Sequence, residues 1–281
     1  MIEMKTIAAP FSVAGVGLHS GADVSVEARP APVGTGLVFL ANGETIPALV
    51  ENVVDTRRCT VIGHNGVQVR TVEHWLAACM IAGVTDVVMA VEGPEMPALD
   101  GSGQSWFNDI LSVGTVPLDG EVTPFIIEKP QWLAVGSSEF YLFPSTTFAV
   151  YAAVDIPGTR VQQMMAGGSI ADPAICEQLL RARTYGLESE VRSLLDLGLA
   201  RGGSLDNALV ITETGYLNEQ VWPMEPAWHK ALDLLGDLAL LGRPIVGSVL
   251  AVRGGHRSHV ELVKLLKKDA VISVGNTSAV K

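Results

Sequence analysis

The sequence predicts an α+β fold with two domains of similar size, each a β-sheet layered against helices. Two observations predict this. Segments with strand patterns are followed by segments with helix patterns, and this order occurs twice along the chain. Between the two cycles, residues 113–124 are rich in Gly, Pro, Asp and Thr, which is typical of a linker. The predicted domains are therefore 1–118 and 124–281.

Length and composition bound the class of protein. A chain of 281 residues can form one large domain or two of roughly 120 to 150 residues. Hydrophobic residues make up 48% and charged residues only 17%, so a sizeable core is expected and wholesale disorder is not. The net charge of −11 argues against nonspecific nucleic-acid binding, which relies on clustered Lys and Arg, but permits an anionic small molecule held by local cations.

The cysteines and the N-terminal residues bear on location. Cys59, Cys79 and Cys176 form an odd, widely spaced set, which fits a reducing compartment and excludes a disulfide scaffold. The N-terminus has no basic stretch followed by an apolar one, and no apolar run reaches the ~18 to 20 residues of a membrane span. We therefore expect a soluble, cytoplasmic protein with no membrane span.

The first half is predicted to be mainly strands followed by helices. Thr71 is expected to cap the helix that begins near Glu73 and His74, and Asp100 is expected to cap the helix that follows. A histidine, His19, lies in a glycine-rich turn, where a structural hydrogen bond is the more common role. The strands are expected at 11–16, 24–29, 56–62, 67–72 and 84–91, with His-Asn-Gly at 64–66 as a hairpin turn, and a helix at 105–111.

The second half repeats the order of strands followed by helices. Residues 156–171, with Gly158, Gly167 and Gly168, are expected to be irregular. Strands are expected at 125–135, 139–143, 147–155, 207–212 and 245–253, and helices at 172–182, 187–197, 227–242 and from the loop at 254–256 to about 268.

The helix at 227–242 carries the most informative spacing. His229, Asp233 and Asp237 are four residues apart and share one face, so an imidazole and a carboxylate can approach one metal ion from a rigid element. Such pairs are more often exposed ion pairs on a helix. Asp237, however, lies in the leucine-rich half, where a buried carboxylate needs a fixed partner such as a metal, a histidine or a cation.

A catalytic zinc site needs three protein ligands and an open position. His229 and Asp233 supply two, and the third is one of five histidines. Among these, His74 has Glu73 beside it, as a carboxylate base requires, and His256 follows glycines after a strand, as a mobile acid or oxyanion stabiliser would. Zincin proteases and zinc deaminases are disfavoured because His-Glu-x-x-His and Pro-Cys-x-x-Cys are absent from the sequence. The five histidines are His19, His64, His74, His256 and His259.

Seven short motifs, in order, closely resemble those of the UDP-3-O-acyl-N-acetylglucosamine deacetylases, zinc hydrolases at the committed step of lipid A synthesis. Each motif is weak alone, but the ordered set covers about residues 5–268 and is specific. The motifs are Gly-Val-Gly-Leu-His-Ser-Gly (15–21), Thr-Val-Glu-His (71–74), Pro-Ala-Leu-Asp-Gly-Ser (97–102), Arg-Thr-Tyr-Gly (183–186), Gly-Gly-Ser (202–204), His-Lys-x-x-Asp-x-x-x-Asp (229–237) and Gly-Gly-His (254–256).

The resemblance implies an active site between the two domains and a role for each matching residue. It implies that zinc, with Fe(II) as an alternative, is held by His74, His229 and Asp233. By the same resemblance Glu73 is the general base, and His256, steadied by Asp237, is the acid. The remaining implied roles are Thr184 as hydroxyl donor to the oxyanion, and Lys230 and Tyr185 as contacts to the UDP-linked acylated amino sugar.

Three features are left open. The family's acyl chain occupies an insert that we expect at 155–175, where Val161, Met164, Met165 and Ile170 either line a passage or fill the core. Arg57 and Arg58, where family members often have a more apolar pair, either bind substrate phosphate or are simply solvated. The alternatives for the whole chain are hydrolysis of a different N-acetylglucosamine conjugate and a sugar-nucleotide binder without activity. A monomer is expected.

Overall fold

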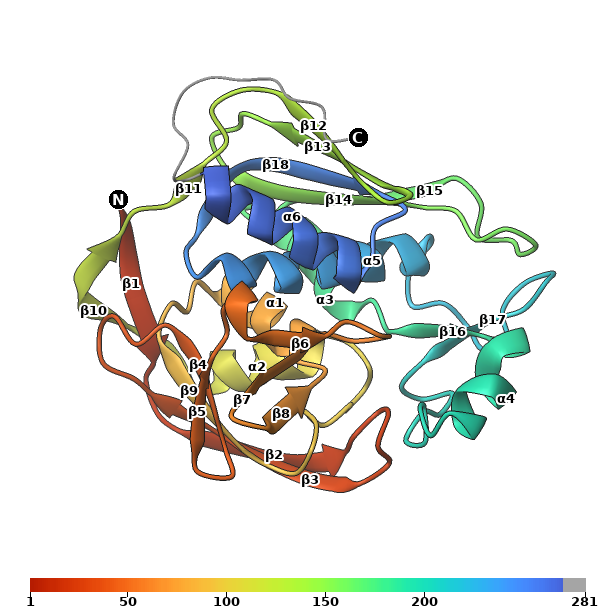
Figure 1. The fold of residues 1–281 in the computed structure, drawn as a ribbon, viewed down its shortest axis with the longest axis horizontal. Coiled ribbons are helices and arrows are strands. Elements are labelled where there is room, and N and C mark those ends of the chain that lie inside the picture. Colours follow the sequence, from red (N-terminus) through yellow and green to blue (C-terminus); the bar gives the residue numbers. More distant parts are fainter. Residues whose placement is uncertain (270–281) are drawn as a thin grey trace.

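A computed structural model describes residues 1–269 and confirms the α+β class. Apart from α4, the helices lie between two layers of sheet, one built from the first half of the chain and one from the second, as Figure 1 shows. Buried apolar side chains from both halves form one continuous core around these helices. None of the helices in residues 1–269 is long and apolar enough to cross a membrane. Residues 270–281 of the predicted second domain lie outside the described residues.

The first half forms the lower sheet layer of Figure 1 together with two helices. Its main sheet has the order β2-β3-β9-β4-β5, and β6, β7 and β8 form a second, smaller sheet. The predicted hairpin turn is confirmed, since Asn65 and Gly66 both have positive φ between β7 and β8, but the first strand of the pair begins at Val61 instead of at residue 56. The elements are β1 (Ile2–Ile7), β2 (Phe11–Val16), β3 (Asp23–Pro30), β4 (Leu37–Ala41), β5 (Glu44–Pro47), η1 (Val50–Asn52), β6 (Val53–Asp55), β7 (Val61–His64), β8 (Val67–Arg70), α1 (Glu73–Ala82), β9 (Val87–Glu92) and α2 (Gln104–Val113).

The predicted linker at 113–124 is instead largely a strand. β10 (Thr115–Val122) pairs antiparallel with β1 at the N-terminus, from Ile7 opposite Thr115 to Ile2 opposite Val122. Composition suggested a linker because Gly, Pro and Asp are rare in strands. The pairing partner, however, is more than a hundred residues away in the sequence, and it supplies the backbone hydrogen bonds that favour the extended form.

The second half forms the upper sheet layer with the order β12-β13-β18-β14-β15, and β11 pairs beside β18. β18 is the last strand within residues 1–269, yet it lies between β13, to which it is antiparallel, and β14, to which it is parallel. The elements are β11 (Phe125–Ile126), β12 (Gln131–Val135), β13 (Ser138–Phe143), β14 (Phe148–Val154), β15 (Met164–Ser169), α3 (Pro173–Arg181), β16 (Tyr185–Leu187), α4 (Glu188–Asp196), β17 (Leu209–Ile211), α5 (Glu225–Leu238), η2 (Ala239–Leu241), β18 (Ile245–Val252) and α6 (His256–Asp269).

The prediction of an irregular segment at 156–171 is wrong for its second part. Residues 164–169 form β15, an edge strand that pairs antiparallel with β14. The glycines are needed there because the chains pass closely: Gly167 has φ +136°, and a Cβ on it would overlap the carbonyl oxygen of Val150. Val161 is fully buried and Met165 is exposed, so this segment is only partly core.

The strand β16, helix α4 and strand β17 form a small unit that lies apart from the other helices, on the right in Figure 1. Its two strands are parallel to each other and pair from Tyr185–Leu209 to Leu187–Ile211. Within the described chain α4 buries none of its residues. An ion pair of 2.8 Å between Arg58 and Glu190 ties this unit to the first half.

Two predicted helix caps are wrong. α1 begins at Glu73, but Thr71 has φ +58° and its hydroxyl donates a hydrogen bond to the buried carboxylate of Glu95 at 2.7 Å instead of capping the helix. Asp100 accepts hydrogen bonds from the N–H and hydroxyl of Ser102, and the Ser102 hydroxyl, not Asp100, accepts from the first N–H of α2. In both places a nearby side chain outcompetes the helix for the hydroxyl or carboxylate.

Candidate active site

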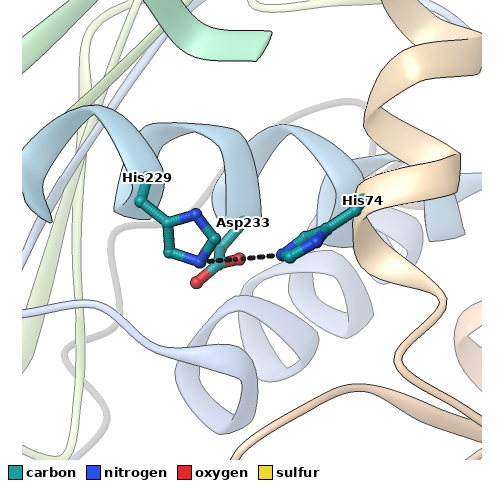
Figure 2. A group of neighbouring side chains, drawn as sticks. All are labelled: His74, His229 and Asp233. Atoms are coloured by element: carbon teal, nitrogen blue, oxygen red, sulfur yellow. Dashed lines mark ion pairs between the residues drawn. The ribbon is translucent and has the colours of Figure 1, made fainter. Parts of the chain in front are cut away.

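Two helices from different halves of the chain bring His74, His229 and Asp233 together. α1 places His74 in its first turn, and α5 places His229 and Asp233 one turn apart, as Figure 2 shows. The Oδ1 atom of Asp233 lies 3.5 Å from Nε2 of His74 and 3.3 Å from Nε2 of His229. All three side chains are buried. The predicted grouping of these residues is therefore found in the structure.

These three residues fit a metal ion. The Oδ1 atom of Asp233 is buried and has no hydrogen-bond partner among the described residues, although it faces two imidazole nitrogens. Two ligand atoms bound at ~2.0–2.1 Å to one tetrahedral zinc ion lie roughly 3.4 Å from each other. The two distances from Asp233 Oδ1 match that spacing, so these three side chains could hold a divalent metal ion such as zinc.

The protonation states of the ligands also suit a metal. Burial lowers the pKa of His229 to about 3, so its imidazole is neutral at neutral pH and Nε2 has a free lone pair. Its Nδ1 lies 3.0 Å from the carbonyl oxygen of Ala182, which fixes the ring with Nδ1–H as donor. Burial opposes ionisation of Asp233, but the positive charges of Lys230 and His256 outweigh it and hold the pKa of that carboxyl well below its usual range.

Glu73 and His256 face each other beside this group. The Nε2 atom of His256 lies 3.7 Å from Oε1 of Glu73 and 3.8 Å from Oδ2 of Asp233, while its Nδ1 lies 2.8 Å from Oδ2 of Asp237. Burial alone would lower the pKa of His256, but the carboxylates of Asp237 and Glu73 raise it to about 9. Burial raises the pKa of Glu73. A cationic imidazole and the carboxyl group of Glu73 therefore flank one side of the ligand group.

Asp237 has the fixed partners that its place among leucines predicted. It is fully buried, and burial opposes its ionisation, but His256 and the hydrogen bonds to it lower the pKa of Asp237 to about 2. Two of its partners were not predicted: the Thr60 hydroxyl donates to Oδ1 at 2.5 Å, and Nδ1 of His259 lies 2.8 Å from Oδ2. His259 could have been found from its spacing, three residues after His256 on one helix face. Thr60 has no such signal in the sequence.

The predicted substrate contacts lie around Asp233. Lys230 bonds Oδ2 of Asp233 at 2.8 Å and lies 5.3 Å from the centre of the Tyr185 ring, which is itself 6.1 Å from the His229 ring. Thr184 directly precedes β16, and its backbone is held by Gly101 and Leu209. The structure therefore brings Lys230 and Tyr185 to the ligand group, with Thr184 next to Tyr185 in the chain.

The remaining histidine and arginine candidates differ in their burial and in their partners. His64 is exposed at the end of β7 and belongs to none of the buried clusters around Asp233 and Asp237. His19 is buried, and both its ring nitrogens are without hydrogen-bond partners in residues 1–269, while its backbone N–H donates to Glu95. Burial lowers its pKa. Arg57 pairs with Asp55 at 2.8 Å, and Arg58 with Glu190.

Comparison with known proteins gives a consistent result. A family model described as UDP-3-O-acyl N-acetylglycosamine deacetylase matches residues 4–268. Proteins named UDP-3-O-acyl-N-acetylglucosamine deacetylase are 37% identical in Myxococcus xanthus, with 94% of this chain and 86% of the relative covered, and 36% identical in Thermosynechococcus vestitus, with 95% of each covered. The relative of the same name in Leptospira biflexa is 36% identical, with 95% of this chain and 90% of the relative covered. The chain therefore belongs to the UDP-3-O-acyl N-acetylglycosamine deacetylase family.

Proposed function

We propose that this protein is a zinc-dependent amide hydrolase that removes the N-acetyl group of UDP-3-O-acyl-N-acetylglucosamine in lipid A synthesis. The observation that carries the proposal is the meeting of His74, His229 and Asp233 at ligand spacing, with Glu73 and His256 beside them. The names of the relatives support the substrate. The products are acetate and the free 2-amine.

His74, His229 and Asp233 would hold the metal, and Fe(II) is an alternative to zinc in such a set. A bound zinc ion supplies Lewis acidity, which lowers the pKa of water and polarises a carbonyl. The chain's own residues must then position the amide, take one proton and give one proton. The two proton transfers have buried side chains in reach, and half-buried side chains are available to position the amide.

Glu73 is the proposed general base. It is fixed by the backbone N–H of Thr60, which donates to Oε2 at 3.1 Å, and its Oε1 faces the site toward His256. As water attacks the acetyl carbonyl, Glu73 accepts the proton that the water loses while the carbon–oxygen bond forms. Burial raises the pKa of Glu73, which makes the carboxylate a better proton acceptor than an exposed glutamate.

His256 is the proposed acid. Its pKa of about 9 keeps the imidazole charged at neutral pH, and Nε2 is the nitrogen that faces the site because Nδ1 is held by Asp237. The positive charge stabilises negative charge that develops on the carbonyl oxygen. When the carbon–nitrogen bond breaks, Nε2–H protonates the amine, which would otherwise be a poor leaving group.

Three further residues are assigned to the substrate. Thr184 is proposed as hydroxyl donor to the oxyanion, because it lies next to Tyr185 at the start of β16. Lys230 is proposed to bind the nucleotide diphosphate and Tyr185 to pack against the substrate, since both lie next to Asp233 or His229. A lysine is a suitable point charge for phosphate.

The acyl chain is proposed to run along β16 toward a cavity of about 620 Å³. β16 starts at Tyr185 beside His229 and reaches the cavity wall at Leu187, and three residues of strand span roughly 10 Å. Pro157, Gly158 and Thr159 also line the cavity, so the cavity joins the segment predicted at 155–175 to the unit of β16, α4 and β17. Exposed apolar side chains on and after α4 support this path: Val191, Leu195 and Leu197.

The test is acetate release, measured with the zinc-loaded protein and after chelation. The UDP-3-O-acyl sugar, in a series of acyl lengths, is compared with UDP-N-acetylglucosamine. Release from the acyl substrate alone supports the proposal. Equal release from both sugars favours a different N-acetylglucosamine conjugate, and stoichiometric zinc without release from either favours a sugar-nucleotide binder. Location in the cytoplasm and a monomeric state stay predictions from the sequence.

A further inference from the structure

Asp237 is the hydrogen-bond acceptor for three side chains, one from the segment before β7 and two from α6. Thr60 donates to Oδ1 at 2.5 Å, while Nδ1 of His256 and Nδ1 of His259 each lie 2.8 Å from the same oxygen, Oδ2. All four side chains are buried, and Asp237 is completely so. The proposed mechanism uses His256 and Asp237 but gives no role to His259.

We propose that His259 is a positioning residue: its Nδ1–H fixes the carboxylate of Asp237, which in turn holds the His256 ring with Nε2 toward the reacting amide. The proposal rests on the proposed function. His259 is not one of the three proposed metal ligands and does not line the cavity near Leu187, and its side-chain hydrogen bond is to Asp237, so it would act through Asp237.

The sharing of one oxygen fixes the tautomers. An ionised carboxylate only accepts hydrogen bonds, so both imidazoles must present a protonated Nδ1 to Asp237. Each carboxylate oxygen has two lone pairs, and on Oδ2 the two imidazoles occupy both. With Thr60 on Oδ1, the carboxylate cannot rotate without breaking a buried hydrogen bond.

His259 is itself held rigidly. It lies one helical turn after His256 on α6, with the two rings 6.2 Å apart. Its ring packs edge-on against the Phe140 ring of β13, with 6.1 Å between the two ring centres. On another side it lies against Gly254, where a Cβ would come within 2.6 Å of Nε2. His259 therefore links Asp237 to the upper sheet and helps to fix its position relative to that sheet.

The alternative is that His259 only fills space under β13. A space-filling role depends on the size of the side chain, whereas a positioning role depends on the N–H group. The two roles predict different outcomes for two substitutions. His259→Leu keeps an apolar filler and removes the donor. His259→Asn is smaller, but its Nδ2–H₂ group sits where the Nδ1–H of histidine sits and can donate to Asp237.

The test measures kcat, KM and zinc content for His259→Leu and His259→Asn. Loss of a supporting hydrogen bond typically costs about 10- to 100-fold in activity, so His259→Leu should lower kcat by that factor with KM and zinc content little changed. His259→Asn should recover most of the lost kcat. His64→Asn, in the exposed hairpin turn, is the matched histidine control and should behave as the wild type.

Unchanged kcat in His259→Leu, or an equal loss in both variants, would overturn the proposal. If His259→Leu does not fold, ¹⁵N NMR of the histidine rings in the metal-free wild-type protein distinguishes the positioning role from the space-filling role. The proposal requires a protonated Nδ1 on both His256 and His259, assigned from the signals that His259→Asn removes, and an Nε2–H tautomer at His259 would refute it. A wild-type protein that releases no acetate would refute the proposed function instead, while the NMR result would still stand.

Discussion

Gly236 of α5 lies directly against the backbone carbonyl of Glu73 on α1, so closely that a Cβ on Gly236 would overlap that oxygen. The two helices cross at this point with backbone against backbone. His229 and Asp233 come before Gly236 on α5, and His74 follows Glu73 on α1. The lack of a side chain at Gly236 therefore sets the separation between the two helices that carry the proposed metal ligands.

Gly236→Ala should push α1 away from α5. The overlap with a carbonyl oxygen, which cannot rotate out of the way, should lower the free energy of unfolding by about 1 to 3 kcal/mol, measured by denaturant titration. It should also weaken zinc binding, measured by competition with a chelator, because His74 moves relative to His229. Gly215→Ala is the control, since no atom lies near a Cβ there. Wild-type zinc affinity in Gly236→Ala would show that the crossing does not set the ligand spacing.

Asp233→Ala should release the metal. The substitution removes the carboxylate that lies between both imidazoles, and two histidines alone make a much weaker site. Zinc content after dialysis, measured by atomic spectroscopy, should fall from about one per chain to near zero. Asp206→Ala, at an exposed position, should keep its zinc. Full occupancy in Asp233→Ala would contradict the ligand assignment.

Glu73→Gln and His256→Ala should each lower kcat by at least ~100-fold, the usual scale for loss of a general base or acid. Both should retain zinc, because neither side chain belongs to the three proposed ligands. The measurement is acetate release at saturating substrate together with metal analysis of the same preparations. Near-normal turnover with bound zinc would remove the affected residue from its proposed role.

The pH dependence of kcat should have an alkaline limb near pH 9. His256 must be protonated to act as an acid, and its raised pKa keeps the proton in place below about pH 9, so activity is lost as the pH rises through that value. Asp237→Asn removes the charge that contributes most to raising this pKa, and should move the limb to lower pH by roughly one to three units. An unmoved limb would show that another group titrates there.

Glu95→Ala should destabilise the protein without removing any proposed catalytic group. Glu95 is fully buried and accepts hydrogen bonds from the N–H groups of His19 and Ser20 and from the Thr71 hydroxyl. Leaving these donors unpaired should cost roughly 2 to 4 kcal/mol of unfolding free energy in denaturant titration. Glu92→Ala, at an exposed position, should cost far less. Equal stability of the two variants would contradict this role for Glu95.

Local patterns were enough to predict the class of the fold and the most informative helix. Helical spacing alone placed His229, Asp233 and Asp237 on one face, and the burial of Asp237 correctly implied a fixed partner. The same chemistry could not choose among five histidines for the third ligand. Only the resemblance of the ordered motifs indicated His74, because the approach of α1 to α5 is a tertiary contact between distant segments.

The errors share one physical cause: each involves a contact between residues that are distant in the sequence. β10 and β15 were mistaken for a linker and an irregular segment because their glycines and prolines are poor strand formers, yet each is extended through pairing with another strand. Thr60 meets Asp237 across 177 residues of sequence, and no local pattern encodes such a contact. Thr71 satisfied the sequence rule for a helix cap, but Glu95, distant from it in the chain, takes its hydroxyl.

The position of β18 has a consequence for how the chain is made. The ribosome releases β13 and β14 long before the strand that must separate them, so the upper sheet cannot close during most of translation. Until residues 245–252 emerge, β12–β13 and β14–β15 can form only as separate hairpins with exposed inner edges. His256 and His259 follow shortly after β18, so the proposed acid and its proposed positioning residue emerge only after the strand that lets the upper sheet close.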